Sequence, residues 1–253
     1  MATLEELRGE IDQIDAQMHD LLIRRVQIGR EVAKAKAGAD TSGPNLRPGR
    51  EAQIMRRLAK RNREPLSIAS VSRIWREILS ANLNQQIAVN AAVFAPDIRV
   101  HDLAREYCGT ASTIVAMDSA EAAVQAVSSG AAQFAILPGI ESGKAWRWWP
   151  NLLGGSAEKP RVLARLPYFT AGPDTIDAMI IGPQEPEPSG DDVTLFAVKD
   201  EDTVEGGREI DRWDGSETWR LVEVDGFVNH ESGHEEAHAR RYRLGAYAVQ
   251  GSL

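Results

Sequence analysis

Apolar residues recur at alternating intervals of three and four along the first stretch of the chain. They are Leu4, Leu7, Ile11, Ile14, Met18, Leu21, Ile28, Val32 and Ala35. This spacing is typical of a helix that packs along a seam, and it predicts a helix from Thr3 to about Gly38. At about 1.5 Å per residue such a helix is about 50 Å long. Short helices alone cannot cover so long a stripe, so the pattern favours a second copy of the chain as its partner.

A charged residue interrupts this apolar stripe. Between Leu21 and Ile28, where the pattern calls for an apolar side chain, the sequence has Arg25. A guanidinium directed into a helix interface is costly unless an anion meets it. Lys36 follows three helical turns later, so both cations project from one face. Arg8 lies beside the seam but about 25 Å from Arg25 along the axis, so it would approach Arg25 only from an antiparallel second copy.

Two shorter amphipathic stretches follow the loop at 37–49, which is rich in Gly and Pro. One predicts a helix from Arg50 to about Arg63, and the other predicts a helix from about Ser67 to Gln86. Their expected buried residues are Ile54, Met55 and Leu58 in the first, and Ile68, Val71, Ile74, Trp75, Ile78, Leu79 and Leu83 in the second. Residues 1–90 therefore read as an all-α domain of three helices.

The pattern changes after Ile87. Apolar strand-like segments at 88–96, 112–117 and 133–138 alternate with helical segments at 100–108 and 119–129, which predicts an α/β unit. We expect Trp146, Trp148 and Trp149 to pack in a core or an interface, 182–192 to be a linker or a long loop, and the rest to form strands with one polar helix near 232–241. The predicted fold is multidomain, with a smaller α/β C-terminal module over residues 91–253.

Composition narrows the class of protein. The chain has 43% hydrophobic and 26% charged residues, as soluble globular proteins do, and it has no apolar run long enough to cross a membrane. The acidic N-terminus lacks the features of a signal peptide. Because Cys108 is the only cysteine, no disulfide can form within the chain, and a cytoplasmic location is the simplest prediction.

Charge is distributed unevenly along the chain. The net charge is −8, yet the first ninety residues are net basic and the remainder is strongly acidic. A basic part can serve an anionic ligand, either a small molecule or a nucleic acid. The acidic second half argues against a nucleic-acid-binding protein.

Three stretches of the N-terminal part resemble the AroQ type of chorismate mutase. They are LEELRGEIDQIDAQMHDLLIRRVQIGREVAKAK, LRPGREAQIMRRL and SRIWREILSANLNQQ. The resemblance implies an intertwined homodimer with antiparallel long helices, in which each of two sites borrows one arginine from the other subunit. It also implies the rearrangement of chorismate to prephenate without a cofactor or a metal.

The same resemblance assigns roles to individual residues. It implies that Lys36 and Gln86 donate to the ether oxygen of the substrate and that Glu51 holds the substrate hydroxyl. The remaining positions would bind substrate, with Arg8 as the borrowed arginine; they are Arg8, Arg25, Arg47, Arg50 and Asn82. Asn82 departs from the small Ser-like residue expected there, and Arg47 stands where some members have an acidic residue.

The second half resembles prephenate dehydratase in outline. Residues 91–153 follow its first lobe, and the ending RRYRLGAYAV resembles the closing strand of an ACT domain. The signature motifs of that family are not kept. Residues 95–99 stand in place of its glycine-rich loop, and residues 138–142 stand in place of its proline–acid–asparagine motif. The sequence also has no Thr-Arg-Phe motif. The resemblance therefore implies a shortened module without dehydratase activity. Its remaining role would be to stabilise the protein, to mediate oligomerisation or to sense an aromatic amino acid effector.

Alternatives remain open at this point. They are a bifunctional mutase–dehydratase, an isochorismate pyruvate lyase, which shares the helical fold, and a non-catalytic shikimate-pathway sensor. His230, His234 and His238 are spaced four apart, which on a helix gives an imidazole face. Such a face would bind Zn²⁺, although a solvated helix face is the favoured interpretation.

Overall fold

The computed structural model describes residues 2–37, 46–140, 144–153, 159–172, 174–229 and 241–252. The chain begins with three helices, α1 (Leu4–Ala37), α2 (Pro48–Arg61) and α3 (Ile68–Asn84). The N–H of Glu6 donates to the Thr3 hydroxyl at 3.2 Å, and the Thr3 N–H donates to the Glu6 carboxylate at 2.7 Å. This reciprocal pair is a capping box, and Ser67 similarly caps α3. Each predicted helix end lies within two residues of the observed end.

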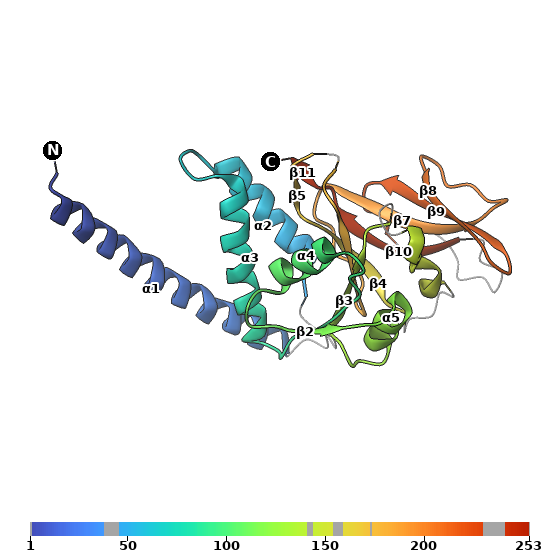
Figure 1. Cartoon of the computed structure of the whole chain (residues 1–253), viewed down its shortest axis with the longest axis horizontal. Coiled ribbons are helices and arrows are strands. Elements are labelled where there is room, and N and C mark those ends of the chain that lie inside the picture. Colours follow the sequence, from blue (N-terminus) through green and yellow to red (C-terminus); the bar gives the residue numbers. More distant parts are fainter. Residues whose placement is uncertain are drawn as a thin grey trace.

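Helix α1 extends away from the rest of the chain and meets α3 near its own C-terminal end (Figure 1). A Cβ atom at Gly29 would lie 2.1 Å from Oδ1 of Asn82, so the absence of a side chain at Gly29 leaves room for the Asn82 amide in this position. The apolar stripe of α1 is solvent-exposed in the single chain, with exposed fractions from 44% at Ile28 to 69% at Leu21. A partner would therefore have a long apolar surface to cover.

In the second part of the chain, the described residues form a nine-stranded mixed sheet. Its strand order is β2-β1-β3-β6-β4-β10-β7-β9-β8. The β1–β2, β1–β3 and β4–β10 pairs are parallel, and the other pairs are antiparallel. The strands are β1 (Asn90–Val93), β2 (Thr113–Ala116), β3 (Phe134–Pro138), β4 (Arg161–Leu166), β6 (Ala178–Gly182), β7 (Asp192–Lys199), β8 (Arg208–Asp214), β9 (Thr218–Asp225) and β10 (Arg241–Ala248).

The remaining elements flank this sheet. Helix α4 (Ile98–Cys108) joins β1 to β2, and α5 (Ala120–Ser128) joins β2 to β3, which confirms the predicted alternation. A separate pair consists of β5 (Phe169–Thr170) and β11 (Gly251–Ser252), and two 3-10 turns, η1 (Lys144–Trp146) and η2 (Trp149–Leu152), precede β4. The fold class of helical region plus α/β region is confirmed, although the α/β region is the larger part of the chain and not the smaller.

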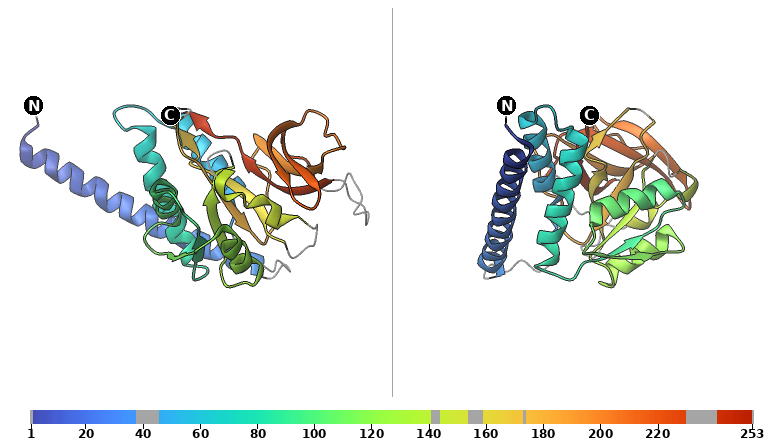
Figure 2. Two further views of the ribbon diagram at one scale, coloured as in Figure 1. Left: turned by 45° about the vertical axis from the view of Figure 1, so that its right-hand side comes forward. Right: turned by 60° about the vertical axis from the view of Figure 1, so that its left-hand side comes forward.

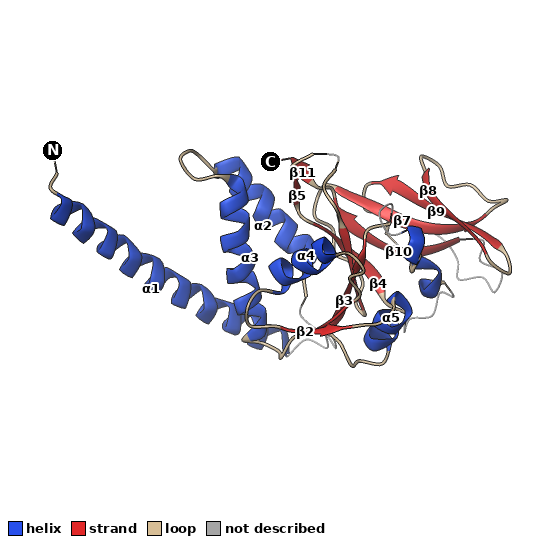
Figure 3. Ribbon diagram, viewed as in Figure 1, coloured by secondary structure: helices blue, strands red, loops and turns tan. Residues whose placement is uncertain are grey.

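Helices α2, α3 and α4 cover one face of the sheet, and they lie between the sheet and α1 (Figure 2). Their buried residues share one core with the strands, including Met55, Leu79, Ala104, Ile136 and Ile180. Helix α5 covers the opposite face together with the two 3-10 turns (Figure 3). The change from helices to strands at residue 90 thus falls inside one continuous core.

Two of the three tryptophans are core residues, as expected. The Trp148 indole N–H donates to the Pro138 carbonyl at 2.9 Å, and the Trp149 N–H donates to Asp211 at 2.8 Å. Trp146 is 42% exposed in the single chain and packs edge-on against Phe94, with 6.5 Å between the ring centroids. Ile74 is 46% exposed, so the expectation that it faces inward was wrong. Residue 74 faces solvent because the inward face of α3 is centred on Val71, Arg76, Leu79 and Ser80.

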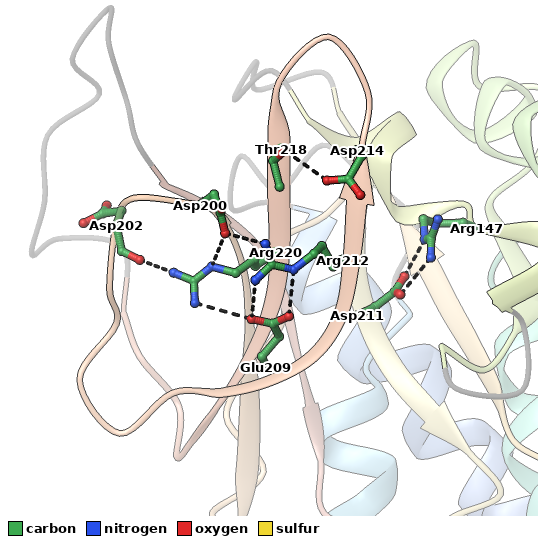
Figure 4. Close-up of polar contacts among 9 residues, drawn as sticks. All are labelled: Arg147, Asp200, Asp202, Glu209, Asp211, Arg212, Asp214, Thr218 and Arg220. Carbon is green, nitrogen blue, oxygen red and sulfur yellow. Dashed lines mark hydrogen bonds and ion pairs between the residues drawn. The ribbon is translucent and has the colours of Figure 1, made fainter.

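Ion pairs hold the far edge of the sheet, where β8 and β9 pair (Figure 4). Arg212 lies 2.6 Å from Asp200 and 3.3 Å from Glu209, and Arg220 lies 3.6 Å and 3.4 Å from the same two carboxylates. Exposed pairs of this kind contribute about 0–1 kcal/mol each. Their charges also protect the β8 edge from pairing with other strands.

Candidate functional site

The meeting point of α1 and α3 gathers several of the predicted site residues. Gly29, which touches Asn82, lies one turn beyond Arg25 on the same face of α1. Oδ1 of Asn82 is buried and accepts no hydrogen bond from the described residues. The Gln86 side chain donates to the Asn82 carbonyl at 3.4 Å. The end of α3 therefore presents amide groups beside the face of α1 that carries Arg25.

Arg25 is half-buried, and no described residue makes a hydrogen bond or an ion pair with its guanidinium. Burial lowers the pKa of Arg25 below its usual value, and no carboxylate of the described residues offsets this effect. A partly desolvated cation without a counter-ion is costly, so this position favours an anionic ligand. A carboxylate would fit it, because a guanidinium binds carboxylates by paired hydrogen bonds.

The two other predicted cations of α1 differ in placement. Arg8 lies exposed near the free end of the helix. Lys36 is in the last turn of α1, three turns beyond Arg25 on the same face, and its side chain lies outside the described residues. Arg8 and Arg25 are not brought together within the single chain.

The remaining predicted residues lie in α2 or directly before it, and two of them contact the sheet region, which is the described part of residues 90–252. Arg50 is exposed and donates to Gln53 at 3.1 Å. Arg47, expected to bind substrate, donates instead to both carboxylate oxygens of Glu187 at 2.7 and 2.9 Å. Glu187 belongs to the segment 182–192, which was expected to be a linker or a long loop. Residues 183–191 form a loop between β6 and β7 that lies against α2.

Glu51 lies in a buried polar cluster between α2, α3, α4 and the sheet. Its Oε2 accepts from Arg76 at 2.6 Å and from the Tyr168 hydroxyl at 3.1 Å. Arg76 also donates to the Tyr107 carbonyl at 3.0 Å, and its guanidinium lies 4.1 Å from the Tyr107 ring. Within the described residues, no hydrogen bond or ion pair joins Glu51 to Arg25 or Asn82.

Burial and the charge of Glu51 shift the pKa values of the other residues in this cluster. Burial is the largest single influence on the pKa of Arg76 and would lower it, but the charge and hydrogen bond of Glu51, together with Tyr107 and Tyr168, raise that pKa above its usual value. Burial, reinforced by the same carboxylate, raises the pKa of Tyr168 well above the ordinary tyrosine range. At neutral pH the Arg76 guanidinium is therefore charged and the Tyr168 hydroxyl is neutral.

Arg76 and Tyr168 were not among the site residues predicted from the sequence. The position of Arg76, three residues before the expected core residue Leu79, was a usable signal, since residues at this spacing share a helix face. Nothing local marked Tyr168, which is 117 positions from Glu51 in the sequence. Its role depends on the path of the chain through the sheet.

The sheet region also holds a polar pocket of about 140 Å³. Arg165 lies 2.8 Å from Asp177, and Glu223 pairs with Arg208 and accepts from the Tyr247 hydroxyl. The charges of the pocket therefore balance one another. It is lined by Ile140, Arg165, Asp177, Met179, Arg208, Ile210, Glu223 and Tyr247.

Among the described residues, no group of His, Cys, Asp or Glu side chains is arranged to hold a metal ion. His230, His234 and His238 lie outside the described residues. So does the polar helix expected near 232–241, except for Arg241, which is the first residue of β10. In the described part of the chain, no helix has both the length and the apolar character needed to cross a bilayer.

The matched family accounts for the helical part of the chain. Residues 7–87 match chorismate mutase type II. This range contains all of the predicted site residues, from Arg8 on α1 to Gln86 after α3. The resemblance predicted from the sequence is thereby confirmed.

Curated relatives extend the similarity past the mutase helices. The bifunctional chorismate mutase/prephenate dehydratase of Pseudomonas aeruginosa is 27% identical over 139 residues, covering 53% of this chain and 38% of that protein. The Neisseria gonorrhoeae protein of the same name is 28% identical over 141 residues, covering 54% and 38%. The chain thus spans 38% of the length of these relatives, and the aligned length exceeds that of the mutase match.

Among solved structures, prephenate dehydratase from Arthrobacter aurescens in complex with L-Phe is 12% identical to this chain. The superposition has a TM-score of 0.46 and covers 64% of this chain and 90% of that one.

Proposed function

We propose that this chain is a chorismate mutase, an isomerase that converts chorismate to prephenate. The observation that carries the proposal is the match of residues 7–87 to chorismate mutase type II, together with Arg25. This half-buried cation interrupts an apolar stripe and has no counter-ion among the described residues. A dianionic substrate would supply that counter-ion.

The proposed mechanism uses positioning and electrostatics. The reaction is an intramolecular rearrangement and needs no nucleophile, metal or redox cofactor. Arg25, with Arg8 of a second copy, would clamp the carboxylates and fold the substrate into its reactive conformer. Lys36 and Gln86 would donate to the ether oxygen, where negative charge develops as the bond breaks.

Three further groups complete the proposed site. Arg50 and Asn82 would contact substrate carboxylates, and Glu51 would accept from the substrate hydroxyl. Arg47 is engaged by Glu187, so we assign it a supporting role at the start of α2 and not direct contact with substrate.

The proposed assembly is a homodimer through α1. The stripe of α1 is exposed over its whole length, and hydrophobic surface of this extent is stabilised by burial. An antiparallel partner helix would cover the stripe and bring Arg8 of one copy to Arg25 of the other. A cytoplasmic location remains part of the proposal.

A second candidate is a bifunctional mutase and prephenate dehydratase. The curated relatives carry both activities in their names, and their alignments to this chain are longer than the mutase helices. The departures in 95–99 and 138–142 favour a mutase without dehydratase activity. An aromatic amino acid effector remains a prediction for the same region.

One assay tests these proposals together. Purified chain is incubated with chorismate, and products are identified before and after acid treatment. Prephenate that becomes phenylpyruvate only on acidification would support a monofunctional mutase. Phenylpyruvate formed without acid would support the bifunctional alternative, and unchanged chorismate would contradict both. Repeating the assay with L-phenylalanine tests the effector.

A further inference from the structure

The sheet region holds the first turns of α2 in place. A Cβ atom at Gly49 would lie 2.5 Å from the Glu187 carbonyl oxygen, so helix and loop are in direct backbone contact. Arg47 pairs with the Glu187 carboxylate. About two turns further along, Arg56 donates to the carbonyls of Ser189 at 3.1 Å and Asp191 at 2.5 Å. The helix segment that carries Arg50 and Glu51 is therefore fixed against the sheet region.

The carboxylate of Glu51 accepts hydrogen bonds from two side chains, one in the helical part of the chain and one in the sheet region. Arg76 comes from α3, within the mutase helices, and Tyr168 comes from the connection between β4 and β5. Both bonds end on Oε2, and Oε1 accepts no hydrogen bond from the described residues. One donor alone would let the carboxylate turn about it, whereas two donors define its orientation and leave Oε1 available.

Tyr168 is itself held by the end of the chain. Its carbonyl accepts from the Gly251 N–H at 2.9 Å, and Gln250 donates to the neighbouring Pro167 carbonyl at 2.7 Å. The next residues form β5, which pairs with β11. The last strand of the sheet region thus fixes the backbone of the tyrosine that contacts Glu51.

We propose that Tyr168 is a positioning residue for the mutase reaction. It orients the Glu51 carboxylate so that Oε1 meets the substrate hydroxyl, and it makes the sheet region a structural support of the mutase site. The inference rests on the proposed function, and it gives residues 90–252 a role that needs no second catalytic activity.

The test compares Tyr168→Phe with Tyr107→Phe. Both changes remove a hydroxyl from the same buried cluster, but the Tyr107 hydroxyl has no partner among the described residues, whereas the Tyr168 hydroxyl donates to Glu51. We expect Tyr168→Phe to lower kcat/KM for chorismate about tenfold, and Tyr107→Phe to leave it unchanged. Thermal unfolding of each variant confirms that the protein is folded at the assay temperature.

A substrate analogue separates positioning from general destabilisation. For an analogue of chorismate whose ring hydroxyl is replaced by hydrogen, wild type and Tyr168→Phe should have equal kcat/KM, because Glu51 has nothing to hold. A loss of equal size for both substrates would overturn the inference, as would equal kcat/KM of wild type and Tyr168→Phe for chorismate. A wild-type chain that does not convert chorismate would overturn the proposed function as well.

Discussion

The Arg76–Glu51 ion pair allows a quantitative prediction about stability. The two side chains are 7% and 12% exposed and lie 2.6 Å apart. Replacing Arg76 with Met removes the cation and leaves a buried carboxylate without its counter-charge. Breaking a buried pair in this way costs about 3–5 kcal/mol. Because a folded domain is stable by about 5–15 kcal/mol, the variant should lose a large fraction of its stability.

A double-mutant cycle measures the coupling. Arg76→Met and Glu51→Gln each leave one buried charge unpaired, whereas the double variant leaves none. We expect the double variant to be less destabilised than the sum of the single variants, by about 2 kcal/mol or more. The assay is urea denaturation, with unfolding free energies compared at similar m-values. Additive effects, or a cost below about 1 kcal/mol for Arg76→Met, would refute the argument that this pair is buried and coupled.

Three further predictions concern activity, reactivity and acid stability. Arg25→Ala should lower kcat and raise KM because a substrate carboxylate loses its partner, whereas Lys36→Ala should mainly lower kcat. Steady-state kinetics measure both effects, and an unchanged kcat for Lys36→Ala would contradict the role proposed for Lys36. Burial raises the pKa of Cys108 to about 12, so a thiol reagent at pH 8 should label the protein only after unfolding, and rapid labelling of the native protein would contradict this. Hydrogen bonds from the side chain and backbone of Arg99 lower the pKa of Asp97 to about 2. The ionised Asp97 carboxylate therefore stabilises the folded state fully at pH values above its unfolded-state pKa of about 3.9. This stabilisation is lost as the pH falls through about 2. Asp97→Asn should reduce the acid sensitivity of unfolding over that range, and an identical acid profile would contradict the assignment.

The helices of the N-terminal part were largely predictable from the sequence. The capping residues Thr3 and Ser67 and the three-and-four spacing of α1 act over one or two turns, so they can be recognised without a tertiary structure. The interruption of the stripe by Arg25 was also visible, because it is a local departure from a regular pattern. The expected inward position of Ile74 was wrong, because the core it was meant to join is formed by the sheet and is reached by a different face of α3.

The candidate site was predictable only in part. The residues of α1 and the end of α3 follow from helix periodicity and from the resemblance to a known family. Arg47 and Glu51 were assigned to substrate by that resemblance, and the structure adds sheet-region partners that the short motif could not contain. Glu187 is 140 positions from Arg47, and no spacing rule connects residues so far apart.

The sequence by itself determined the order and the type of most elements, because hydrophobic periodicity, caps and turn residues act between neighbours along the chain. The tertiary structure alone decided that α2 and α3 share a core with the sheet, and that Tyr168 donates to Glu51. These contacts depend on how distant segments meet when apolar surface is buried. The charge of Glu51 could be read in the sequence, whereas its partners became known only once the sheet had folded against α2.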